Sequence, residues 1–505
     1  MKRLSRQLFQ QGFILPPNLS CGTLADFPER VVQFGEGNFL RAFADWMLDV
    51  LNEKGLFGGK VVVVQPIRRG LAATLNEQDG LYTVLLRGVQ NGAVVETRRI
   101  VTAISRALNP YDAWEALAQC FRSPALRFVI SNTTEAGITF ANEAYRRGQC
   151  PESFPAKVTA LLFERFLAVG GDAARGLIFL PCELIERNGD ALRRCALQHA
   201  EAWGLGQAFA DWVRGANYFV NTLVDRIVPG YPRDEAALLA RELGYEDELL
   251  DAGEVFHLWV IEGPRRLAEE IPFHRVGLNV VWTDDLTPYR ARKVRILNGA
   301  HTASVLAAFH GGMNTVREMV EDPVFGAFVR RAIFEEILPT VPLPESEKAA
   351  YAEAVLERFR NPFIRHDLLS IALNSVSKWT VRVLPSLLDY FRARGCLPPL
   401  LCFSLAALLY FYRGRRTGPD TITGLRDHET YLVHDEPEVL AFFDACWEAP
   451  ELRRDVRQLV AKVLGNEGMW GADLNRVGDL AGTVIRALEA IQADGMRQAV
   501  QKLLG

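Results

Sequence analysis

The sequence predicts an α/β protein with a parallel-sheet domain over residues 1–285 and a mostly α-helical domain over residues 286–505. Before residue 285, short β-branched runs alternate with amphipathic helical segments, which is the pattern of a parallel sheet buried on both faces. After it, helical periodicity replaces the strand-like runs. A chain of 505 residues is long enough for two large domains.

The strands of the first domain are predicted from near-continuous apolar runs. These runs cover residues 31–34, 60–65, 81–86, 127–131, 176–181 and 278–282. Helical patterns over 40–52 and 156–167 lie between them. Residues 81–89 and 93–101 are separated only by Gln-Asn-Gly, which predicts an antiparallel hairpin.

The second domain is predicted to begin with a helix at Thr287-Pro288, because Thr is a good N-cap and Pro suits the first helical position. Gly311-Gly312 ends this helix. Further helices are predicted over 344–359, 366–373, 397–412 and 479–493. The segment 397–412 is apolar but shorter than the roughly 20 residues that a bilayer crossing needs, so we expect a buried helix.

Composition favours an enzyme acting on a small molecule. Lys and Arg total 57 against 61 Asp and Glu, a net charge of −4 that does not suit a nucleic-acid partner. The eight cysteines form no Cys-x-x-Cys pair, and the first residues contain no continuous apolar run. We therefore expect a cytoplasmic protein with reduced thiols and no membrane partner. The eight histidines show no metal-binding spacing, so we expect a metal-independent mechanism.

A glycine-rich turn follows the first predicted strand. Candidate cofactor-binding residues are Phe34, Gly35, Gly37, Asn38, Phe39 and Arg41. A strand, a Gly-x-Gly turn and a helix together form a cradle for a dinucleotide pyrophosphate, although Leu40 replaces the usual third glycine. This turn predicts a Rossmann-like dinucleotide-binding domain.

The end of the second predicted strand leaves the choice between NAD and NADP open. Gln65 stands where an acidic residue usually contacts the adenosine ribose. Arg68 and Arg69 follow, and either they face a 2′-phosphate or they belong to a solvated loop.

Two polar clusters are candidates for chemistry. At 100° per residue on an α-helix, His301 lies about 80° and Asn298 about 140° round from Lys293, so all three share a broad face. An amine, an amide and an imidazole suit proton transfer at a carbonyl. The alternative is a surface lysine, a capping asparagine and a core histidine. A second cluster contains Asn221, Asp225 and Arg226; the last two are explained equally well by a structural ion pair and by catalysis.

These motifs, in this order, resemble the polyol-specific long-chain dehydrogenase/reductase family, of which mannitol dehydrogenase is the best-known member. The matching segments are the Gly35 turn with its Phe-x-Arg-Ala continuation, residues 78–83, residues 221–227 and Lys293-x4-Asn298-x2-His301. Within the family, the chain is most similar to the tagaturonate reductase (altronate oxidoreductase) branch. The segments that carry this likeness are 34–46, 131–138, 181–192, 222–235, 293–303, 359–374 and 407–414.

The resemblance implies reversible NADH-dependent reduction of D-tagaturonate to D-altronate in hexuronate (galacturonate) catabolism. It implies that Lys293 is the general acid/base, that Asn221 and Asn298 hold the oxyanion, and that His301 orients the substrate. Mannitol dehydrogenases carry an arginine where this chain has Ser370, which disfavours mannitol as the substrate. A uronate carboxylate needs a cation, and the candidate substrate-binding residues are Lys378, Arg365 and His366.

Two alternatives remain at this point. One is a sister activity of the same family, such as fructuronate reductase or a mannitol or mannitol-phosphate dehydrogenase. The other is a nucleotide-binding sensor without turnover, which is disfavoured because Lys293, Asn221 and Asn298 are all present. The sequence makes no prediction of oligomeric state.

Overall fold

The computed structural model describes residues 2–134 and 136–505. The chain forms two compact units, one made of Met1–Gly88 and Val94–Leu286 and the other of Val89–Ala93 and Thr287–Gly505. The first is built around a parallel sheet and the second around buried helices.

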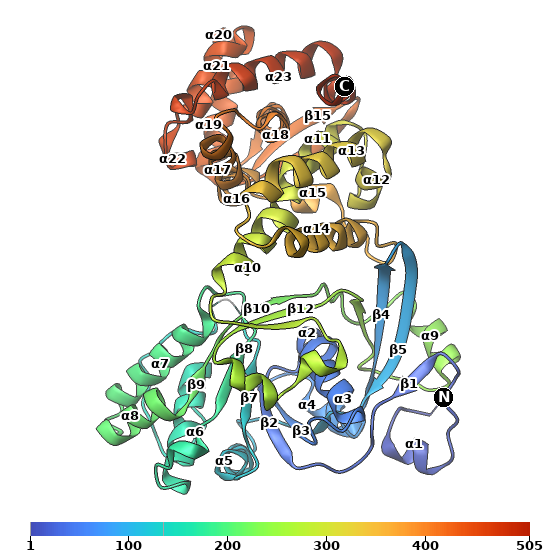
Figure 1. The fold of residues 1–505 in the computed structure, drawn as a ribbon, viewed down its shortest axis with the longest axis vertical. Helices are drawn as coiled ribbons and strands as arrows, with labels where there is room; N and C mark the ends of the chain where they lie inside the picture. Colours follow the sequence, from blue (N-terminus) through green and yellow to red (C-terminus); the bar gives the residue numbers. More distant parts are fainter. Residues whose placement is uncertain (1, 135) are drawn as a thin grey trace. The chain divides into compact units, whose positions relative to one another are not determined.

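The N-terminal unit contains a six-stranded sheet in which each neighbouring pair of strands is parallel (Figure 1). In spatial order the strands are β6 (Ile104–Leu108), β3 (Lys60–Val64), β2 (Glu29–Phe34), β7 (Phe128–Ser131), β8 (Ile178–Pro181) and β9 (Tyr218–Phe219). This is the strand order of a Rossmann sheet. The predicted parallel sheet is confirmed, and its two edge strands, β6 and β9, lie outside the predicted strand runs.

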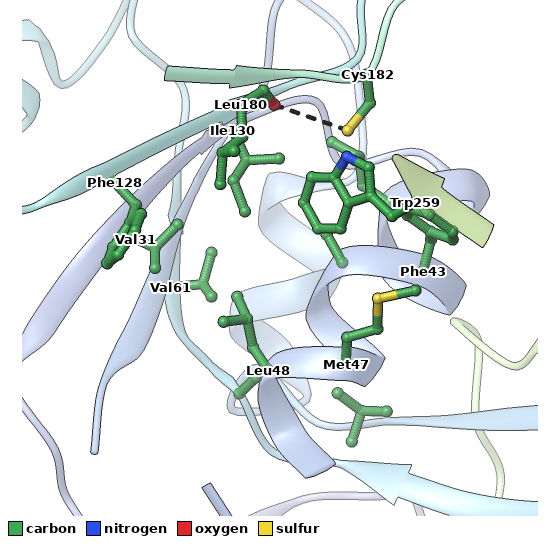
Figure 2. Packing of buried hydrophobic residues seen from close by; sticks show 14 of the residues in the cluster. Val31, Phe43, Met47, Leu48, Val61, Phe128, Ile130, Leu180, Cys182 and Trp259 are labelled. Atoms are coloured by element: carbon green, nitrogen blue, oxygen red, sulfur yellow. Dashed lines mark hydrogen bonds between the residues drawn. The ribbon is translucent and has the colours of Figure 1, made fainter. Parts of the chain in front are cut away.

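Both faces of this sheet are buried, as its continuous apolar runs predict. Successive side chains of a strand point to opposite faces. Val61 and Val63 of β3 therefore pack into a core shared with the helix over residues 46–53, whereas Val62 and Val64 pack into another core with the helices over 114–122 and 154–168. Figure 2 shows the first core, in which Phe43, Met47, Leu48 and Trp259 pack beside sheet residues.

Three of the predicted strands belong to other sheets. β4 (Tyr82–Gln90) and β5 (Ala93–Val101) are neighbours in a sheet of order β1-β5-β4-β11, with β1 at Leu19–Cys21 and β11 at Asp251–Glu254. Asn91 and Gly92, both with positive φ, join them as the hairpin motif predicts. β13 (Val280–Thr283) lies in a third sheet with β10 (Asn221–Asp225) and β12 (Leu258–Glu262).

The helix that follows β2 differs from the regular α-helix predicted over 40–52. It consists of α2 (Asn38–Leu40), a π-helical turn η1 (Arg41–Asp45) and α3 (Trp46–Glu53). The predicted helix over 156–167 is α6 (Phe154–Ala168), capped by the Ser153 hydroxyl. The other α-helices of this unit are α1 (Arg6–Gln10), α4 (Ala72–Glu77), α5 (Trp114–Arg122), α7 (Asn188–Ala202), α8 (Gln207–Ala216) and α9 (Ala236–Leu243).

The C-terminal unit begins with the helix predicted at Thr287, which runs without a break to His310. It comprises α10 (Thr287–Arg292), a π-helical segment η5 (Lys293–Gly299) and α11 (Ala300–His310). Further α-helices are α12 (Val316–Glu321), α13 (Pro323–Arg331), α14 (Glu345–Phe359), α15 (Leu368–Ile371), α16 (Ser375–Arg382), α17 (Leu384–Arg394), α18 (Pro399–Phe411), α19 (Pro437–Glu448), α20 (Pro450–Arg454), α21 (Val456–Leu464), α22 (Glu467–Trp470), α23 (Leu480–Asp494) and α24 (Met496–Leu504).

Two features of this unit differ from the expectations. The helix predicted over 366–373 is only α15, because Asp367 pairs with Thr315 as an isolated β-bridge. A small antiparallel sheet of β14 (Gly414–Gly418), β15 (Thr421–Arg426) and β16 (Glu429–His434) was not predicted. Its strands are short and partly exposed, so their hydrophobic pattern is weak.

The apolar helix α18 forms the centre of the C-terminal unit. It packs against α23 and α11, and nearly all of its side chains are buried (Figure 1). The predicted buried helix is thus confirmed. Within the described part of the chain, no helix combines the length and the hydropathy that a membrane span requires.

Candidate active site

The glycine-rich turn lies where the strand order of the sheet reverses. β2 ends at Phe34 and its parallel neighbour β7 ends at Ser131. Gly35 has φ +120°, and a Cβ atom at this position would lie 3.0 Å from the carbonyl oxygen of Asn132. Only glycine suits this turn. The crevice at the carboxyl ends of the strands, at such a reversal point, is the dinucleotide site of a Rossmann sheet.

Gly37 leaves one side of the turn open. It is the N-cap of α2 with φ −68°, and no atom lies within 4 Å of a Cβ built on it. The protein itself therefore leaves room for a side chain at position 37, without backbone strain or a steric clash. An open N-terminus with free N–H groups is what a pyrophosphate needs, so the residues present fit a dinucleotide.

Arg41 and Phe34 shape the turn from within the protein. Arg41 is 2% exposed, and its guanidinium donates to the Glu36 carbonyl over 3.2 Å and to the Asn38 side-chain oxygen over 2.6 Å. A third hydrogen bond goes to the Leu249 carbonyl. Phe34 is fully buried. Both side chains are thus placed to hold the turn, while the main chain faces the crevice.

Two of the motifs shared with the family, residues 78–83 and 221–227, each supply a side chain that binds the π-turn η1. The Tyr82 hydroxyl donates to the Arg41 carbonyl over 2.9 Å, and Arg226 donates to the Ala42 carbonyl over 2.5 Å. Side chains that insert into the hydrogen-bond ladder of a helix stabilise such irregular turns. Arg226 also donates to the carbonyls of Val255 and Phe256. These three main-chain contacts give Arg226 a structural role that differs from the ion pair expected from the sequence.

Two buried carboxyl groups lie beneath the same turn. Asp45 accepts a hydrogen bond from the Gln33 amide over 3.0 Å, and burial raises the pKa of Asp45 to about 7. Asp251 lies 3.8 Å from Arg41, and burial raises its pKa to about 7 as well, although the Arg41 charge opposes this shift. Buried acids of this kind are poised between their charged and neutral forms near neutral pH.

At the end of β3, polar groups converge on Gly70. A Cβ at Gly70 would collide with the Glu36 carboxylate and would lie 2.8 Å from the Gln65 side chain. Arg68, one of the two candidates for a 2′-phosphate, forms an ion pair with Glu152 at 2.8 Å and lies over the ring of Tyr111. A carboxylate near this strand end suits a free ribose hydroxyl better than a 2′-phosphate.

Asn221 begins β10 in the N-terminal unit and is 4% exposed. Its Oδ1 accepts from the Asp190 main-chain N–H over 3.1 Å, which fixes the orientation of the amide. Its Nδ2 donates to the Asp190 carboxylate over 3.2 Å and to Glu262 over 3.0 Å. Since an amide has two N–H donors, both are already used in this structure.

Lys293 is the first residue of the π-helical segment η5, and Asn298 is its last residue but one, before Gly299. Both side chains are half-buried. The angles expected for a regular α-helix do not apply, because a π-turn is wider. Short π-helical segments occur frequently at functional sites. Arg295 anchors η5 through an ion pair with Asp389 at 2.7 Å and a hydrogen bond to the Thr340 carbonyl.

His301, on the first turn of α11, is buried against aromatic rings. It stacks on Phe359 with ring centroids 4.1 Å apart and meets His366 edge-on at 5.3 Å. Burial and the nearby positive charges hold the pKa of His301 well below its usual value, so its ring is neutral. Its Nε2 is buried and has no hydrogen-bond partner among the described residues. A buried unpaired nitrogen is costly unless a ligand pairs with it.

The three predicted substrate-binding residues have different environments. His366 contacts His301. Lys378 on α16 is half-buried and donates to the Ile371 carbonyl over 2.9 Å, and burial lowers its pKa. Arg365 is 79% exposed and is paired with Asp367 at 3.0 Å. The structure thus disfavours Arg365 as a carboxylate ligand.

The structure brings Lys378 and His301 near a residue that the sequence analysis missed, Arg382. Its charge lowers the pKa of both of these residues. The signal that could have found it is its spacing, since Arg382 lies four residues after Lys378 on one helix face. Among the described residues, no group of three or more His, Cys, Asp or Glu side chains could hold a metal ion.

Family models match both parts of the chain. Residues 29–275 match the mannitol dehydrogenase Rossmann domain and residues 285–492 match the mannitol dehydrogenase C-terminal domain. Altronate oxidoreductases from Shigella flexneri and from Escherichia coli O139:H28 are each 47% identical over 482 residues, which cover 95% of this chain and 98% of theirs.

Solved structures share the fold over the whole chain. Mannitol 2-dehydrogenase from Pseudomonas fluorescens, solved as a ternary complex with NAD and D-mannitol, is 23% identical with a TM-score of 0.67, and 99% of each chain is covered. D-sorbitol dehydrogenase in its substrate-free form is 23% identical with a TM-score of 0.78, covering 99% of this chain and all of that one.

Proposed function

Because the chain belongs to the mannitol dehydrogenase family, we propose that it is an NAD-dependent tagaturonate reductase that interconverts D-tagaturonate and D-altronate in hexuronate catabolism. The observation that carries this proposal is the near-full-length similarity to altronate oxidoreductases. The strand order and the open Gly37 turn support a dinucleotide cofactor. Glu36 beside Gly70, together with the ion-paired Arg68, favours NAD over NADP.

The two units have different tasks in this proposal. Residues 1–285 bind the dinucleotide, and residues 286–505 bind the substrate and supply the proton. NADH, when bound, supplies the hydride for the ketone carbon. Lys293 donates a proton to the oxygen as the alkoxide forms, and it accepts that proton in the reverse direction. Each turnover thus consumes one NADH and one proton per ketone reduced.

Asn298 and His301 assist this proton transfer. The Asn298 amide donates to the developing oxyanion, which is the group whose charge grows most in the transition state. The neutral His301 uses its unpaired Nε2 to orient the substrate oxygen. His366 positions the His301 ring by edge-on contact, and Lys378 adds positive charge for an anionic substrate.

The family resemblance implies that Asn221 holds the oxyanion, but its hydrogen bonds favour a positioning role. Both of its N–H donors are already bound to carboxylates. Asn221 could donate to an oxyanion only after releasing Asp190 or Glu262. We therefore assign the oxyanion to Asn298 first and treat Asn221 as a positioning residue.

The partner in this proposal is a small hexuronate or aldonate anion, and no nucleic acid or membrane is involved. All eight cysteines are free thiols, which suits the reducing cytoplasm.

A substrate panel tests the proposal directly. The purified full chain is assayed for oxidation of NADH, and separately of NADPH, with D-tagaturonate, D-fructuronate, D-fructose and D-fructose 6-phosphate. The highest kcat/KM is expected for D-tagaturonate with NADH. A higher kcat/KM for D-fructuronate would assign the sister activity, and a preference for either fructose compound would assign a mannitol or mannitol-phosphate dehydrogenase.

A further inference from the structure

Arg382 differs from Arg292 and Arg295, the arginines directly before and within η5. Arg292 is paired with Glu347 at 3.0 Å, and Arg295 is paired with Asp389 at 2.7 Å. Arg382, by contrast, is half-buried and has no hydrogen bond or ion pair to any described residue. Burial alone lowers its pKa, with no carboxylate to oppose this effect. A half-buried charge loses part of its hydration, so the absence of a counter-ion among the described residues calls for an explanation.

The backbone places Arg382 beside the proposed catalytic segment. A Cβ at Gly299 would lie 2.9 Å from the Arg382 carbonyl oxygen, so the end of α16 touches the end of η5 directly after Asn298. Arg382 also follows Lys378 by four residues, which puts the two cations on one face of α16. Two positive side chains on this helix thus lie next to the segment that carries Lys293 and Asn298.

The local charges are dominated by cations. The charge of Arg382 reaches both His301 and Lys378, and Arg358 adds to the positive potential at His301. Asp435 acts on Lys378, and Asp367 acts on His366 while pairing with Arg365. A substrate carboxylate would complement this cluster.

We propose that Arg382, with Lys378 one turn before it, forms the subsite that binds the carboxylate of the substrate. This inference rests on the proposed function and adds the residue that selects a hexuronate over a neutral ketose. Arginine suits the task because its planar guanidinium can bind a carboxylate through two parallel hydrogen bonds. Lys378, already tied to the Ile371 carbonyl, contributes a single charge.

The test compares variants in the full-length enzyme. Affinity for D-altronate is measured by calorimetry on the NADH complex, and kcat/KM is measured for D-tagaturonate and for D-tagatose, which carries CH2OH in place of the carboxylate. R382M is expected to weaken D-altronate binding about 10–100-fold, the range for losing a charge-assisted hydrogen bond. NADH affinity and kcat/KM for D-tagatose should change less than threefold. R382K should lie between R382M and the wild type.

Control variants and a stability measurement separate the explanations. Arg317 is an exposed arginine of the same unit that pairs with Glu321, and R317M should bind D-altronate like the wild type. If Arg382 only stabilises the C-terminus of α16, R382M will lower the melting temperature and leave D-altronate affinity unchanged, which overturns the inference. Loss of affinity in R365M but not in R382M also overturns it. A wild type that neither binds D-altronate nor reduces D-tagaturonate instead overturns the proposed function.

Discussion

Arg226 and Ala42 lie 184 residues apart, and the Arg226 guanidinium donates a 2.5 Å hydrogen bond to the Ala42 carbonyl. The bond ends inside the π-turn that follows the glycine-rich loop. Burial lowers the pKa of Arg226 to about 9, and the ring of Trp46 lies 4.4 Å from the guanidinium carbon. The turn is therefore held in shape by a residue from a distant strand end.

Arg226→Met should destabilise the protein. The substitution keeps much of the side-chain volume but leaves three carbonyls without their donor, at about 1 kcal/mol each. We expect the free energy of unfolding to fall by roughly 3 kcal/mol, measured by urea denaturation. Arg214→Met, which removes an exposed arginine paired with Asp211, is the matched control and should have little effect. Equal free energies of unfolding for Arg226→Met and Arg214→Met would show that Arg226 does not stabilise the π-turn.

Gly37→Ala should separate cofactor binding from folding. Gly37 has an ordinary φ and open space around it, so the variant should unfold like the wild type. The added methyl group would meet the pyrophosphate, and NADH affinity should fall at least roughly tenfold, measured by fluorescence titration. Gly215→Ala on α8, also with open space, is the control for NADH binding. Unchanged NADH affinity in Gly37→Ala would place the pyrophosphate elsewhere.

Lys293→Ala should abolish proton transfer while sparing the cofactor. We expect kcat to fall about 10²–10⁴-fold, the usual contribution of a general acid. NADH affinity should remain within a few-fold of the wild type, since Lys293 belongs to the other unit. Steady-state kinetics and an NADH titration measure the two quantities. Near-normal kcat in this variant would remove Lys293 from the mechanism.

Asn298→Ala should mainly lower activity, whereas Asn221→Ala should mainly lower stability. Loss of an oxyanion donor should lower kcat of Asn298→Ala about 10²–10³-fold with little change in stability. Asn221→Ala leaves two half-buried carboxylates without their shared donor, so its main effect should be a lower melting temperature. Kinetics and thermal unfolding are measured on both. A large loss of kcat in Asn221→Ala, with a loss of stability only in Asn298→Ala, would instead identify Asn221 as the oxyanion donor.

Asp45→Asn should change how stability depends on pH. Burial raises the folded pKa of Asp45 to about 7 from 3.8, so the folded protein binds this proton more tightly than the unfolded chain. Stability contributed by this group is therefore lost as pH rises from about 4 to about 7. The free energy of unfolding of the variant, measured by urea denaturation, should therefore rise relative to that of the wild type between about pH 4 and about pH 7 and then level off. For Asp211→Asn, a control at an exposed position, the difference in free energy of unfolding from the wild type should not change with pH.

Much of the fold follows from local pattern. The valine run of β3 and the apolar residues of α18 are buried on all sides, and such segments carry a strong periodic or continuous apolar signal. β6 and the sheet of β14 to β16 were missed because their strands are short and partly exposed. Their position depends on partners that are distant in sequence.

The sequence by itself determined the α/β architecture and the glycine-rich turn, because these depend on local spacing and composition. Its resemblance to a known family supplied the roles expected of the candidate catalytic residues. Only the tertiary structure decided that Arg41 and Arg226 support the turn and that the donors of Asn221 are already used. It also decided that Arg365 is exposed, whereas Arg382 has no counter-ion among the described residues. The physical reason is that burial and hydrogen-bond partners are set by segments far apart in the chain.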